Sequence, residues 1–454
     1  MSSNCDIPRV AVIGGGLAGC ECALHLARVG VPVTIFEQKP QRRSPAHQSG
    51  DLAELVCSNS LRSNELTSGV GLLKQEMREL GSAFMATADA CTVPAGKALA
   101  VDRERFARAM TETVENTPGI TLVRQEILAL DDAALEGFSA VVLAAGPLVS
   151  DSLAHSLAEA IHAATGVKQL YFYDAIAPIV TAESVDMGIA FRGSRYEDPD
   201  DPQTPGDYIN CPFEKDEYLA FHAALLAAEK VAARDFEKEL HFEGCMPIEA
   251  LAERGERTLT FGPFKPVGFT DPRTGRRPWA IVQLRAENRN ASMYNLVGCQ
   301  TKLTYAAQAD VFRRIPGLAR AEFARFGSMH RNTYVNAPQV LAPDLRLQGR
   351  ENLWLAGQIT GVEGYVESAA CGLWVGMLLA ARLHGQTLLP PPPETALGAL
   401  LLHLQTPVKR FQPSNAHFGL MPDLPERAKK KDRKALFSVR AREEFALWRE
   451  RAAR

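Results

Sequence analysis

Paired cysteines, long apolar runs and a strong excess of charge are all missing from this sequence. The nine cysteines are an odd number without any C-x-x-C pair, which argues against zinc and a disulfide framework and indicates free thiols in a reducing cytoplasm. No apolar run approaches the ~20 residues that span a bilayer, and the short polar start, Met1 to Pro8, lacks a secretory apolar core. A net charge of −3 excludes bulk attraction to nucleic acid but allows a local basic face. We therefore expect a cytoplasmic protein with no metal site, no membrane contact and no evident obligate protein partner.

What the sequence does contain is a dinucleotide-binding motif near its start. The apolar run Val10 to Ile13 predicts a buried parallel strand, a helical pattern continues through Ala27, and Val31 to Phe36 predicts a second strand. Glycines in G-x-G-x-x-G spacing allow a tight turn, close approach of a pyrophosphate and close helix packing, and the acid after the second strand can bind a ribose. The predicted cofactor-binding residues are Gly14, Gly15, Gly16, Leu17, Ala18, Gly19 and Glu37. The alternative is a glycine-rich turn that binds no ligand.

A second glycine-rich turn lies far downstream, after an apolar stretch that begins at Asn352. Its glycines, Gly357, Gly361 and Gly364, precede a helix of small residues that starts at about Tyr365. The N-terminus of such a helix suits anionic or electron-rich ligand atoms. Two separated turns of this kind favour FAD over NAD. We therefore predict an α/β fold with a Rossmann-like FAD-binding domain of the glutathione-reductase clan.

The middle of the chain changes character, which predicts an α+β domain inserted into the FAD-binding domain. The expected division is 1–190 and 326–410 for the FAD-binding domain, 191–325 for the insertion, and 411–454 for a basic helical tail. Local patterns predict a strand at 127–130, a strand at 170–175 that resumes the main sheet, and an exposed linker or flexible loop over 192–208. They also predict a helix over 213–233 and several strands between 259 and 297.

Two cysteines stand in settings that differ from those of the other seven. Cys57 ends a short apolar patch and is followed at once by polar side chains, namely Ser58, Asn59, Ser60, Arg62 and Asn64. Hydroxyls, amides and an arginine suit a thiol that meets a ligand, although a structural cysteine is the more frequent case. Cys245 lies between Gly244 and Met246, where glycine permits an unusual backbone or close approach of a ligand.

Basic residues gather in three further places. Arg276 and Arg277 form the most basic turn of the middle part, and a merely solvated turn explains them equally well. His330 and Arg331 would lie near a flavin if the first and last segments share one domain. Lys429 to Lys434 opens the basic tail, for which a solvated face and contact with nucleic acid are both open.

Blocks of sequence along nearly the whole chain carry a family resemblance. They are AVIGGGLAGCECALHLA, AELVCSNSLRSNEL, PAGKALAVDR, FEGCMPIEALAERG, TLTFGPFKPVG, YNLVGCQTKLTYAAQ, MHRNTYVN, AGQITGVEGYVESAACGLWVG, ETALGALL and FQPSNAHFGLMP. These blocks resemble the bacterial folate- and FAD-dependent tRNA (uracil-5-)-methyltransferases, the TrmFO family (formerly Gid), which is related to the GidA-type tRNA-modifying flavoproteins. The departures are Cys299 in place of an aromatic residue and Cys371 in place of serine. Ala145 also stands where many FAD proteins have threonine.

The resemblance implies an activity and roles for particular residues. The reaction would methylate C5 of a T-loop uridine (position 54) in tRNA, with methylenetetrahydrofolate as carbon donor, FAD as methylene carrier and NAD(P)H as reductant. A thiolate that adds at C6 of the uracil makes C5 nucleophilic. Cys245 would be that nucleophile, and Cys57 would remove the C5 proton or protect the flavin adduct; the allocation between the two thiols stays open. Tyr365 would position the ring or the folate by stacking, with core packing as the alternative.

The substrate side would include His330, Arg331, Arg276, Arg277 and the basic tail. Because the sequence has one dinucleotide fingerprint, NAD(P)H is expected to visit the flavin face, where the folate also binds. Three other functions are compatible with the sequence: the same chemistry on a ribosomal RNA uridine, a flavin oxidoreductase acting on a small molecule, and a flavin-stabilised RNA-binding protein that helps tRNA to fold. The sequence leaves open the oligomeric state and the choice between NADH and NADPH.

Overall fold

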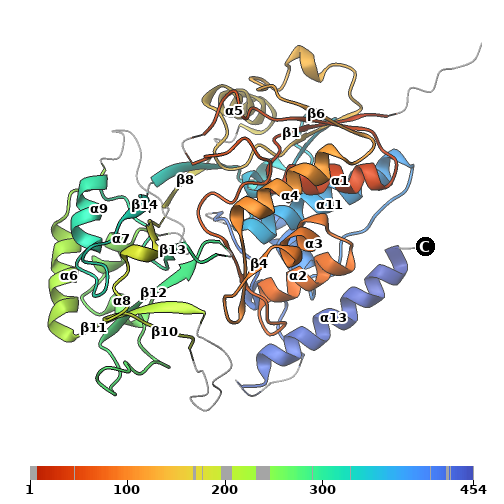
Figure 1. The fold of residues 1–454 in the computed structure, drawn as a ribbon. Coiled ribbons are helices and arrows are strands. Elements are labelled where there is room, and N and C mark those ends of the chain that lie inside the picture. The colour runs from red at the N-terminus through yellow and green to blue at the C-terminus, as the bar shows by residue number, and fades with distance from the viewer. Residues whose placement is uncertain are drawn as a thin grey trace, which may run out of the picture.

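The computed structural model has two lobes, which Figure 1 shows side by side. It describes residues 8–44, 46–166, 170–175, 177–195, 207–231, 246–288, 290–327, 329–408, 411–425, 429 and 431–452, and for 170–175 and 329–331 it gives the backbone alone. The larger lobe contains both ends of the described chain, and the smaller lobe contains its middle.

A five-stranded parallel sheet forms the centre of the larger lobe. Its strand order is β16-β7-β1-β2-β6. Val10, Ala11 and Val12 of the central strand have no exposed surface, as expected for a parallel strand that is covered on both faces. The strands are β1 (Val10–Ile13), β2 (Val33–Phe36), β6 (Ile120–Val123), β7 (Ala140–Leu143) and β16 (Leu353–Leu355).

Two helices that follow glycine-rich turns pack closely against each other in this lobe. They are α1 (Leu17–Arg28), which follows β1, and α11 (Tyr365–Leu383), which comes after β16. Small residues make the close crossing possible, because a Cβ atom at Gly372 would lie 2.2 Å from the Ala18 carbonyl oxygen. The crossing brings the N-termini of both helices to the carboxyl edge of the parallel sheet, where β1 and β16 end.

The remaining elements of the larger lobe surround this core. Helix N-termini are capped locally: the side chains of Ser68, Ser82, Asp102 and Ser150 each accept a hydrogen bond from a backbone N–H of the first turn. The helices are α2 (Gly69–Glu79), α3 (Ala83–Ala90), α4 (Arg103–Glu115), α5 (Asp151–Thr165), α10 (Ala337–Val340), α12 (Ala396–Gln405) and α13 (Arg433–Ala452), with short 3-10 turns η1 (Ala133–Leu135), η4 (Gln358–Thr360) and η5 (Phe418–Leu420). An antiparallel sheet adds β3 (Ser60–Ser63), β4 (Thr92–Val93) and β5 (Ala98–Val101).

The smaller lobe is built on a six-stranded antiparallel sheet with its own hydrophobic core. Its strand order is β10-β11-β12-β13-β9-β14. Phe213, Phe221 and Phe264 pack together in this core, with ring centroids 5.3–6.4 Å apart. The strands are β9 (Ile179–Thr181), β10 (Phe191–Gly193), β11 (Tyr208–Phe213), β12 (Ala280–Ala286), β13 (Met293–Leu296) and β14 (Phe323–Arg325), and the helices are α6 (Lys215–Ala227), α7 (Ile248–Ala252), α8 (Thr258–Phe261) and α9 (Tyr305–Phe312), with a 3-10 turn η2 (Ala182–Ser184).

These two cores confirm the predicted class, an α/β sheet domain with an inserted α+β part. One core draws its residues from 10–161 and 334–448, and the other from 180–321. Between them, β8 (Leu170–Ala175) and β15 (Met329–Tyr334) pair with each other as a separate two-stranded antiparallel sheet. The exact domain boundaries, such as 190/191 and 325/326, stay a prediction.

Several local predictions were wrong for identifiable reasons. The strand at 127–130 is absent because β6 is the edge of the sheet and the chain beyond it turns along a cavity. The strand at 170–175 forms but pairs with β15 instead of resuming the main sheet. The helix expected over 213–233 begins at Lys215, because Phe213 completes β11 and Glu214 caps the helix, and it ends at Ala227.

Two further stretches differ in part from expectation. The ends of the expected linker 192–208 belong to β10 and β11, and 196–206 lie outside the described residues. The region 259–297 contains β12 and β13 as predicted, but it begins in the short helix α8.

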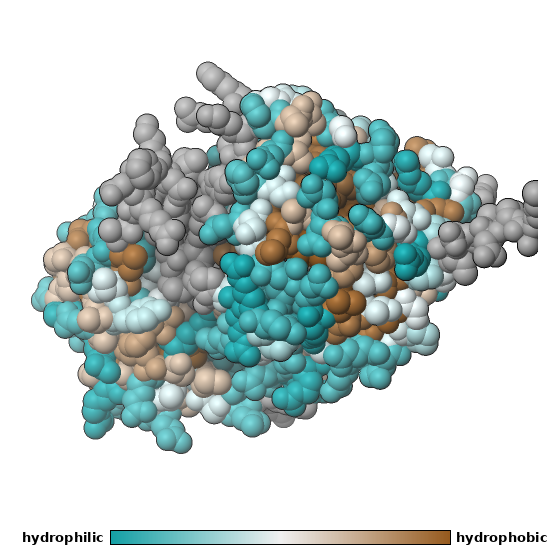
Figure 2. All heavy atoms as spheres, turned by 90° about the horizontal axis from the view of Figure 1, so that it is seen from above, coloured by the Kyte–Doolittle hydropathy of each residue, from teal (hydrophilic) through white to brown (hydrophobic). Residues whose placement is uncertain are grey.

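Helix α11 has the length and composition of a membrane span, with a mean hydropathy of 1.4. It packs against α1, and 72% of its most apolar window is buried inside the fold. The burial explains its apolar sequence as core packing. On the face shown in Figure 2, hydrophilic side chains predominate and the hydrophobic ones form separate patches.

The basic C-terminal helix α13 packs against the larger lobe. Phe445 and Trp448 are buried, and the Trp448 indole N–H donates to the Leu389 carbonyl oxygen at 2.9 Å. Two of its arginines make ion pairs within the chain, Arg433 with Asp423 at 3.0 Å and Arg449 with Glu79 at 2.7 Å. Figure 1 places this helix on the side of the larger lobe away from the smaller lobe.

Candidate functional site

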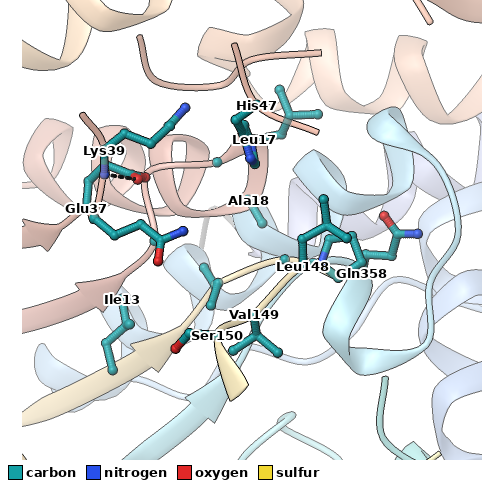
Figure 3. A pocket seen from close by; sticks show the side chains of 18 of the residues that line it. Ile13, Leu17, Ala18, Glu37, Lys39, His47, Leu148, Val149, Ser150 and Gln358 are labelled. Atoms are coloured by element: carbon teal, nitrogen blue, oxygen red, sulfur yellow. Dashed lines mark hydrogen bonds between the residues drawn. The ribbon is translucent and has the colours of Figure 1, made fainter. Parts of the chain in front are cut away.

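A cavity with an empty volume of about 1050 Å³ lies at the carboxyl edge of the parallel sheet. The turns after β1, β2, β7 and β16 all contribute to its lining, which is where an open parallel sheet binds ligands. Figure 3 shows Glu37 and Lys39 on one side of the cavity and Leu148 and Gln358 on the other.

The glycine positions of the first turn are under different steric constraints. Gly14 has φ +104°, and a Cβ atom there would lie 2.6 Å from the Ala144 carbonyl oxygen. A Cβ at Gly19 would lie 1.9 Å from the Gly14 carbonyl oxygen, so α1 could not pack as it does. Gly16 has an ordinary φ of −77°, and nothing lies within 4 Å of where its Cβ would be. The protein itself therefore does not require glycine at 16, whereas a phosphate lying against the N-terminus of α1 would.

We expect Gly16→Ala to separate cofactor binding from folding. The added methyl group fills space in the cavity, and an overpacking cost of about 1–3 kcal/mol corresponds to roughly 5- to 150-fold weaker binding of the predicted FAD. The melting temperature of the apoprotein should not fall, because alanine suits this backbone conformation. Titration of the apoprotein with FAD, followed by flavin fluorescence, measures the first effect. Wild-type affinity in this variant would show that the turn does not hold a pyrophosphate.

The acid that closes β2 is fixed by backbone amides. The Gly15 N–H donates to Glu37 Oε2 at 2.8 Å and the Lys39 N–H donates to Oε1 at 2.9 Å, so both oxygens have a set orientation. Glu37 lines the cavity and is 6% exposed. These bonds leave lone pairs on each oxygen that can accept hydrogen bonds from ribose hydroxyls. The residues present thus fit a bound dinucleotide.

The predicted glycines of the second turn are placed differently from one another. Gly357 lines the cavity with φ +80°, and a Cβ there would lie 2.7 Å from the Ala18 methyl group. Gly361 and Gly364 are not among the lining residues. A Cβ at Gly361 would lie 2.4 Å from the Phe411 ring, and one at Gly364 would lie 2.4 Å from Glu367 Oε2. These two glycines are needed for close packing beside the cavity.

A thiol and a phenol meet at the side of this cavity. Cys57 Sγ lies 2.8 Å from the hydroxyl oxygen of Tyr365, the first residue of α11 and a cavity-lining residue. That oxygen also accepts hydrogen bonds from the backbone N–H groups of Cys57 at 2.7 Å and Ser58 at 3.2 Å. Since both acceptor positions of the oxygen are filled, its own hydrogen is directed at the sulfur. Burial raises the pKa of Tyr365 well above 10, so the phenol keeps that hydrogen at neutral pH.

Three guanidinium groups surround the loop that carries Cys57. Arg103 donates to the Leu55 carbonyl oxygen at 2.9 Å, Arg285 donates to Ser58 Oγ at 2.6 Å, and Arg325 donates to the Ala46 carbonyl oxygen at 3.3 Å. All three lie close enough to Cys57 to interact with it electrostatically. Positive charge beside a thiol favours the thiolate.

Asn59 joins the two lobes at this loop, which the sequence did not reveal. It has no exposed surface, and its amide nitrogen donates to the carbonyl oxygens of Val101 at 3.1 Å and Ala286 at 2.7 Å. Arg285 Nε donates in turn to Asn59 Oδ1 at 2.8 Å. Asn59 therefore holds β12 of the smaller lobe against the Cys57 loop. The sequence of β12 did contain a sign of this contact. The charged residues Arg285 and Glu287 lie in or beside an apolar strand, and buried charges require partners.

The other predicted site residues lie away from the cavity or outside the residues that the structure describes. Cys245 lies outside the described residues, as do the side chains of His330 and Arg331, whose backbone in β15 pairs with that of Asp174 and Tyr173. Arg276 and Arg277 are exposed in a turn of the smaller lobe that the Asp271–Arg276 bridge closes. Within the described part of the chain, no group of three or more His, Cys, Asp or Glu residues is arranged to hold a metal ion.

Comparison with known proteins gives a consistent family. Residues 9–387 match the family model described as glucose inhibited division protein A (GidA). The chain is 68% identical over 442 residues to the methylenetetrahydrofolate–tRNA-(uracil-5-)-methyltransferase TrmFO of Nitratidesulfovibrio vulgaris strain DP4, covering 97% of this chain and 90% of the relative. It is 56% identical over 440 residues to the protein of the same name from Geobacter sulfurreducens, covering 97% and 98%.

The fold resembles a solved structure of low sequence identity. The form II crystal structure of Aquifex aeolicus GidA has a TM-score of 0.66 and 17% identity, covering 99% of this chain and 74% of that chain. At this identity the likeness establishes the fold alone, a GidA-like flavoprotein fold.

Proposed function

Since this chain belongs to the GidA family and, within it, to the TrmFO group, we propose that it methylates C5 of the T-loop uridine at position 54 of tRNA. One observation carries the proposal: Cys57 and Tyr365, which are 308 positions apart in the sequence, meet beside a cavity that fits a dinucleotide. A thiol in this place has a use in uracil chemistry, in which a sulfur nucleophile or a base must act next to the carbon donor.

The family and the cavity support the proposed cofactors. Methylenetetrahydrofolate would supply the carbon, FAD would carry it as a methylene unit, and NAD(P)H would supply the electrons. The turn after β1, the carboxylate of Glu37 and Gly357 would hold the FAD. NAD(P)H has no fingerprint of its own in this sequence, so we expect it to use the flavin face in turn with the folate, as competition between the two in steady-state kinetics would show.

Neighbouring groups of the chain stabilise the thiolate form of Cys57. The O–H of Tyr365 is directed at Sγ, and a hydrogen bond to sulfur favours the charged form. The nearby guanidinium of Arg285 favours it further, and that of Arg103 does so less because it forms an ion pair with Glu287 at 2.5 Å. A thiolate formed in this way can take the proton that leaves C5 of the uracil.

Cys245 is the proposed nucleophile at C6 of the uracil. The described residues on either side of 232–245 are both fixed to the same stretch of the smaller lobe. The Val231 N–H donates to the Lys302 carbonyl oxygen at 2.8 Å, and the Ile248 N–H donates to the Gln300 carbonyl oxygen at 2.7 Å. Glu249, which is fully buried, accepts a hydrogen bond from the Lys302 N–H at 2.6 Å.

We propose that the RNA reaches this site from the smaller lobe and that the protein acts in the cytoplasm, where tRNA is modified. The tail helix α13 contributes less to RNA binding than its charge suggests, because Arg433 pairs with Asp423 and Arg449 pairs with Glu79 of the same chain. Arg276 and Arg277, which are exposed, are the stronger candidates for phosphate contacts.

Neutralising Arg276 and Arg277 should weaken tRNA binding and flatten its dependence on salt. Each phosphate contact that is lost lowers the slope of log affinity against log salt by roughly one unit. Binding of unmodified tRNA by the Arg276→Gln, Arg277→Gln double variant at several salt concentrations measures both effects. Arg9→Gln is the control, because Arg9 precedes β1 at the opposite edge of the sheet from the cavity. An unchanged slope in the double variant would remove these residues from the RNA interface.

The test of the function is mass spectrometry of an unmodified tRNA transcript after incubation with the protein, methylenetetrahydrofolate and NADPH. We expect one added methyl group on the T-loop uridine and none with Cys245→Ser. If no methyl group is added while flavin stays bound and reducible, ribosomal RNA is the next substrate to test, followed by small molecules. Tight tRNA binding that needs neither folate nor thiols would instead indicate an RNA-folding role.

A further inference from the structure

We propose that three stacked rings of the smaller lobe, Tyr305, Phe326 and Phe323, form a platform on which an unpaired base of the substrate RNA stacks beside the reacting uridine. We call these three residues the aromatic platform. The inference rests on the proposed function and adds a base-binding site outside the cofactor cavity.

The aromatic platform is a column of nearly parallel rings with an open outer end. Phe326 is the shared ring: its centroid lies 5.1 Å from that of Tyr305 and 4.9 Å from that of Phe323, with interplanar angles of 16° and 20°. The guanidinium of Arg313 lies over the ring of Phe323 at 5.7 Å. Tyr305 stacks on Phe326 and is nevertheless 62% exposed, whereas tyrosine side chains are usually more deeply buried. A further flat ring can therefore extend the column at Tyr305.

A buried glutamine holds the platform in place before any ligand binds. Gln308 lies one helical turn after Tyr305 in α9 and has no exposed surface. Its side-chain amide accepts a hydrogen bond from the Gly327 N–H at 2.7 Å and donates to the Gly327 carbonyl oxygen at 2.8 Å. These bonds fix the backbone next to Phe326 against the helix that carries Tyr305. A fixed platform loses little conformational entropy on binding.

The platform residues also adjoin, in the sequence, the segments that lead to the two proposed thiols. On one side, Tyr305 directly follows the stretch 300–304, to which Val231 and Ile248 are fixed. On the other side, Phe326 follows Arg325, whose charge interacts with Tyr365 and Cys57. In Figure 1, α9, which begins with Tyr305, and β14, which begins with Phe323 and ends just before Phe326, stand next to each other in the smaller lobe.

A nucleobase is the ligand that suits this position. A uridine must leave its stack before a thiol can reach C6, and the bases beside it then lose a stacking partner. Aromatic side chains commonly replace that partner in proteins that bind unpaired RNA. The folate or nicotinamide ring is a poorer candidate, because none of the three platform residues lines the dinucleotide cavity.

The experiment compares Tyr305→Ala, Tyr305→Leu and Tyr305→Phe with the wild type, using an unmodified tRNA transcript as the probe. We expect alanine to weaken tRNA binding about 5- to 150-fold, the range that corresponds to the loss of one base–aromatic stack. Phenylalanine should restore binding, and leucine should restore little, because stacking needs a flat ring. The salt slope should stay as in the wild type, since no phosphate contact is lost, unlike in the arginine double variant.

Unchanged tRNA affinity in Tyr305→Ala would overturn the inference. If the KM for methylenetetrahydrofolate is raised at the same time, the platform belongs to the folate ring instead. Tyr305 is exposed, so its replacement should leave the melting temperature unchanged. The proposed function is tested separately by tRNA methylation in the wild type, and the platform by the ratio of variant to wild-type affinity.

Discussion

Replacing Cys57 by alanine should slow methylation of the RNA by orders of magnitude while FAD stays bound. The Sγ atom lies 2.8 Å from the Tyr365 hydroxyl, but Cys57 is not among the residues that line the cavity, so cofactor binding does not depend on it. Loss of a group that takes a proton in the reaction typically costs 10²- to 10⁴-fold in rate, and we expect a loss of roughly this size. Single-turnover methylation of tRNA, with the flavin spectrum recorded on the same sample, measures both quantities.

A matched control is available among the other cysteines. Cys371 lies in α11, is buried, and has its sulfur 3.7 Å from the Thr360 hydroxyl. Cys371→Ser keeps a group of similar size that can bond to Thr360, so we expect wild-type activity. If Cys57→Ala methylates at the wild-type rate as well, the thiol at 57 has no part in the reaction and the proposed mechanism is wrong.

The Tyr365 hydroxyl can be tested in the same assay. Tyr365→Phe removes the hydrogen bond to Sγ and leaves the N–H groups of Cys57 and Ser58 without this acceptor. A hydrogen bond to a charged group contributes about 1.5–3 kcal/mol, or roughly 10- to 150-fold in rate. Because the donor stabilises the thiolate, its loss should slow the step in which the thiolate takes a proton.

The second large effect is expected from Gly372→Val, which should cost the protein both its flavin and much of its stability. A Cβ atom at position 372 would lie 2.2 Å from the Ala18 carbonyl oxygen and 2.6 Å from the Ala18 Cα atom. Backbone atoms cannot yield as the end of a side chain can, so α11 must move away from α1. Since the N-termini of both helices line the cavity, the same movement distorts the dinucleotide site.

We expect a destabilisation above about 4 kcal/mol, the size that marks severe core disruption. Thermal unfolding followed by circular dichroism, together with the flavin content of the purified protein, measures the effect. Gly385→Ala is the control, because this glycine follows the end of α11 with φ +71° and no atom within 4 Å of its Cβ position. It should lose only about 1 kcal/mol from the strained backbone. A Gly372→Val variant with normal flavin content and melting temperature would show that the helices can separate freely.

Much of the larger lobe was determined by sequence that is local to it. The turn after β1 requires glycine at positions 14 and 19 because of atoms within the same strand–helix unit or the neighbouring strand. Asp102 caps α4 through a hydrogen bond to the Arg105 N–H, three residues away. Patterns of this range are visible in any window of the sequence, and the predictions for β1, α1 and the start of α11 were confirmed for that reason.

The tertiary structure decided which distant residues meet. β8 has the composition of a strand of the main sheet, yet it pairs with β15, more than 150 residues later in the chain. Asn59, two residues after Cys57, was counted among the polar neighbours of a thiol that meets a ligand, but all its described hydrogen bonds are with Val101, Ala286 and Arg285 of the protein itself. Nothing near Tyr305 in the sequence indicates that it stacks on Phe326.

Local structure can be predicted from the sequence because periodicity, chain stiffness and capping act over a few bonds. The meeting of Cys57 with Tyr365 depends on how α11 lies on α1 and on how the smaller lobe is held by Asn59 and Arg285. The sequence alone thus determined that a dinucleotide turn and two unusual cysteines exist. The packing of helices through glycine and the burial of paired polar groups decided that one of those cysteines shares a hydrogen bond with the first residue of α11.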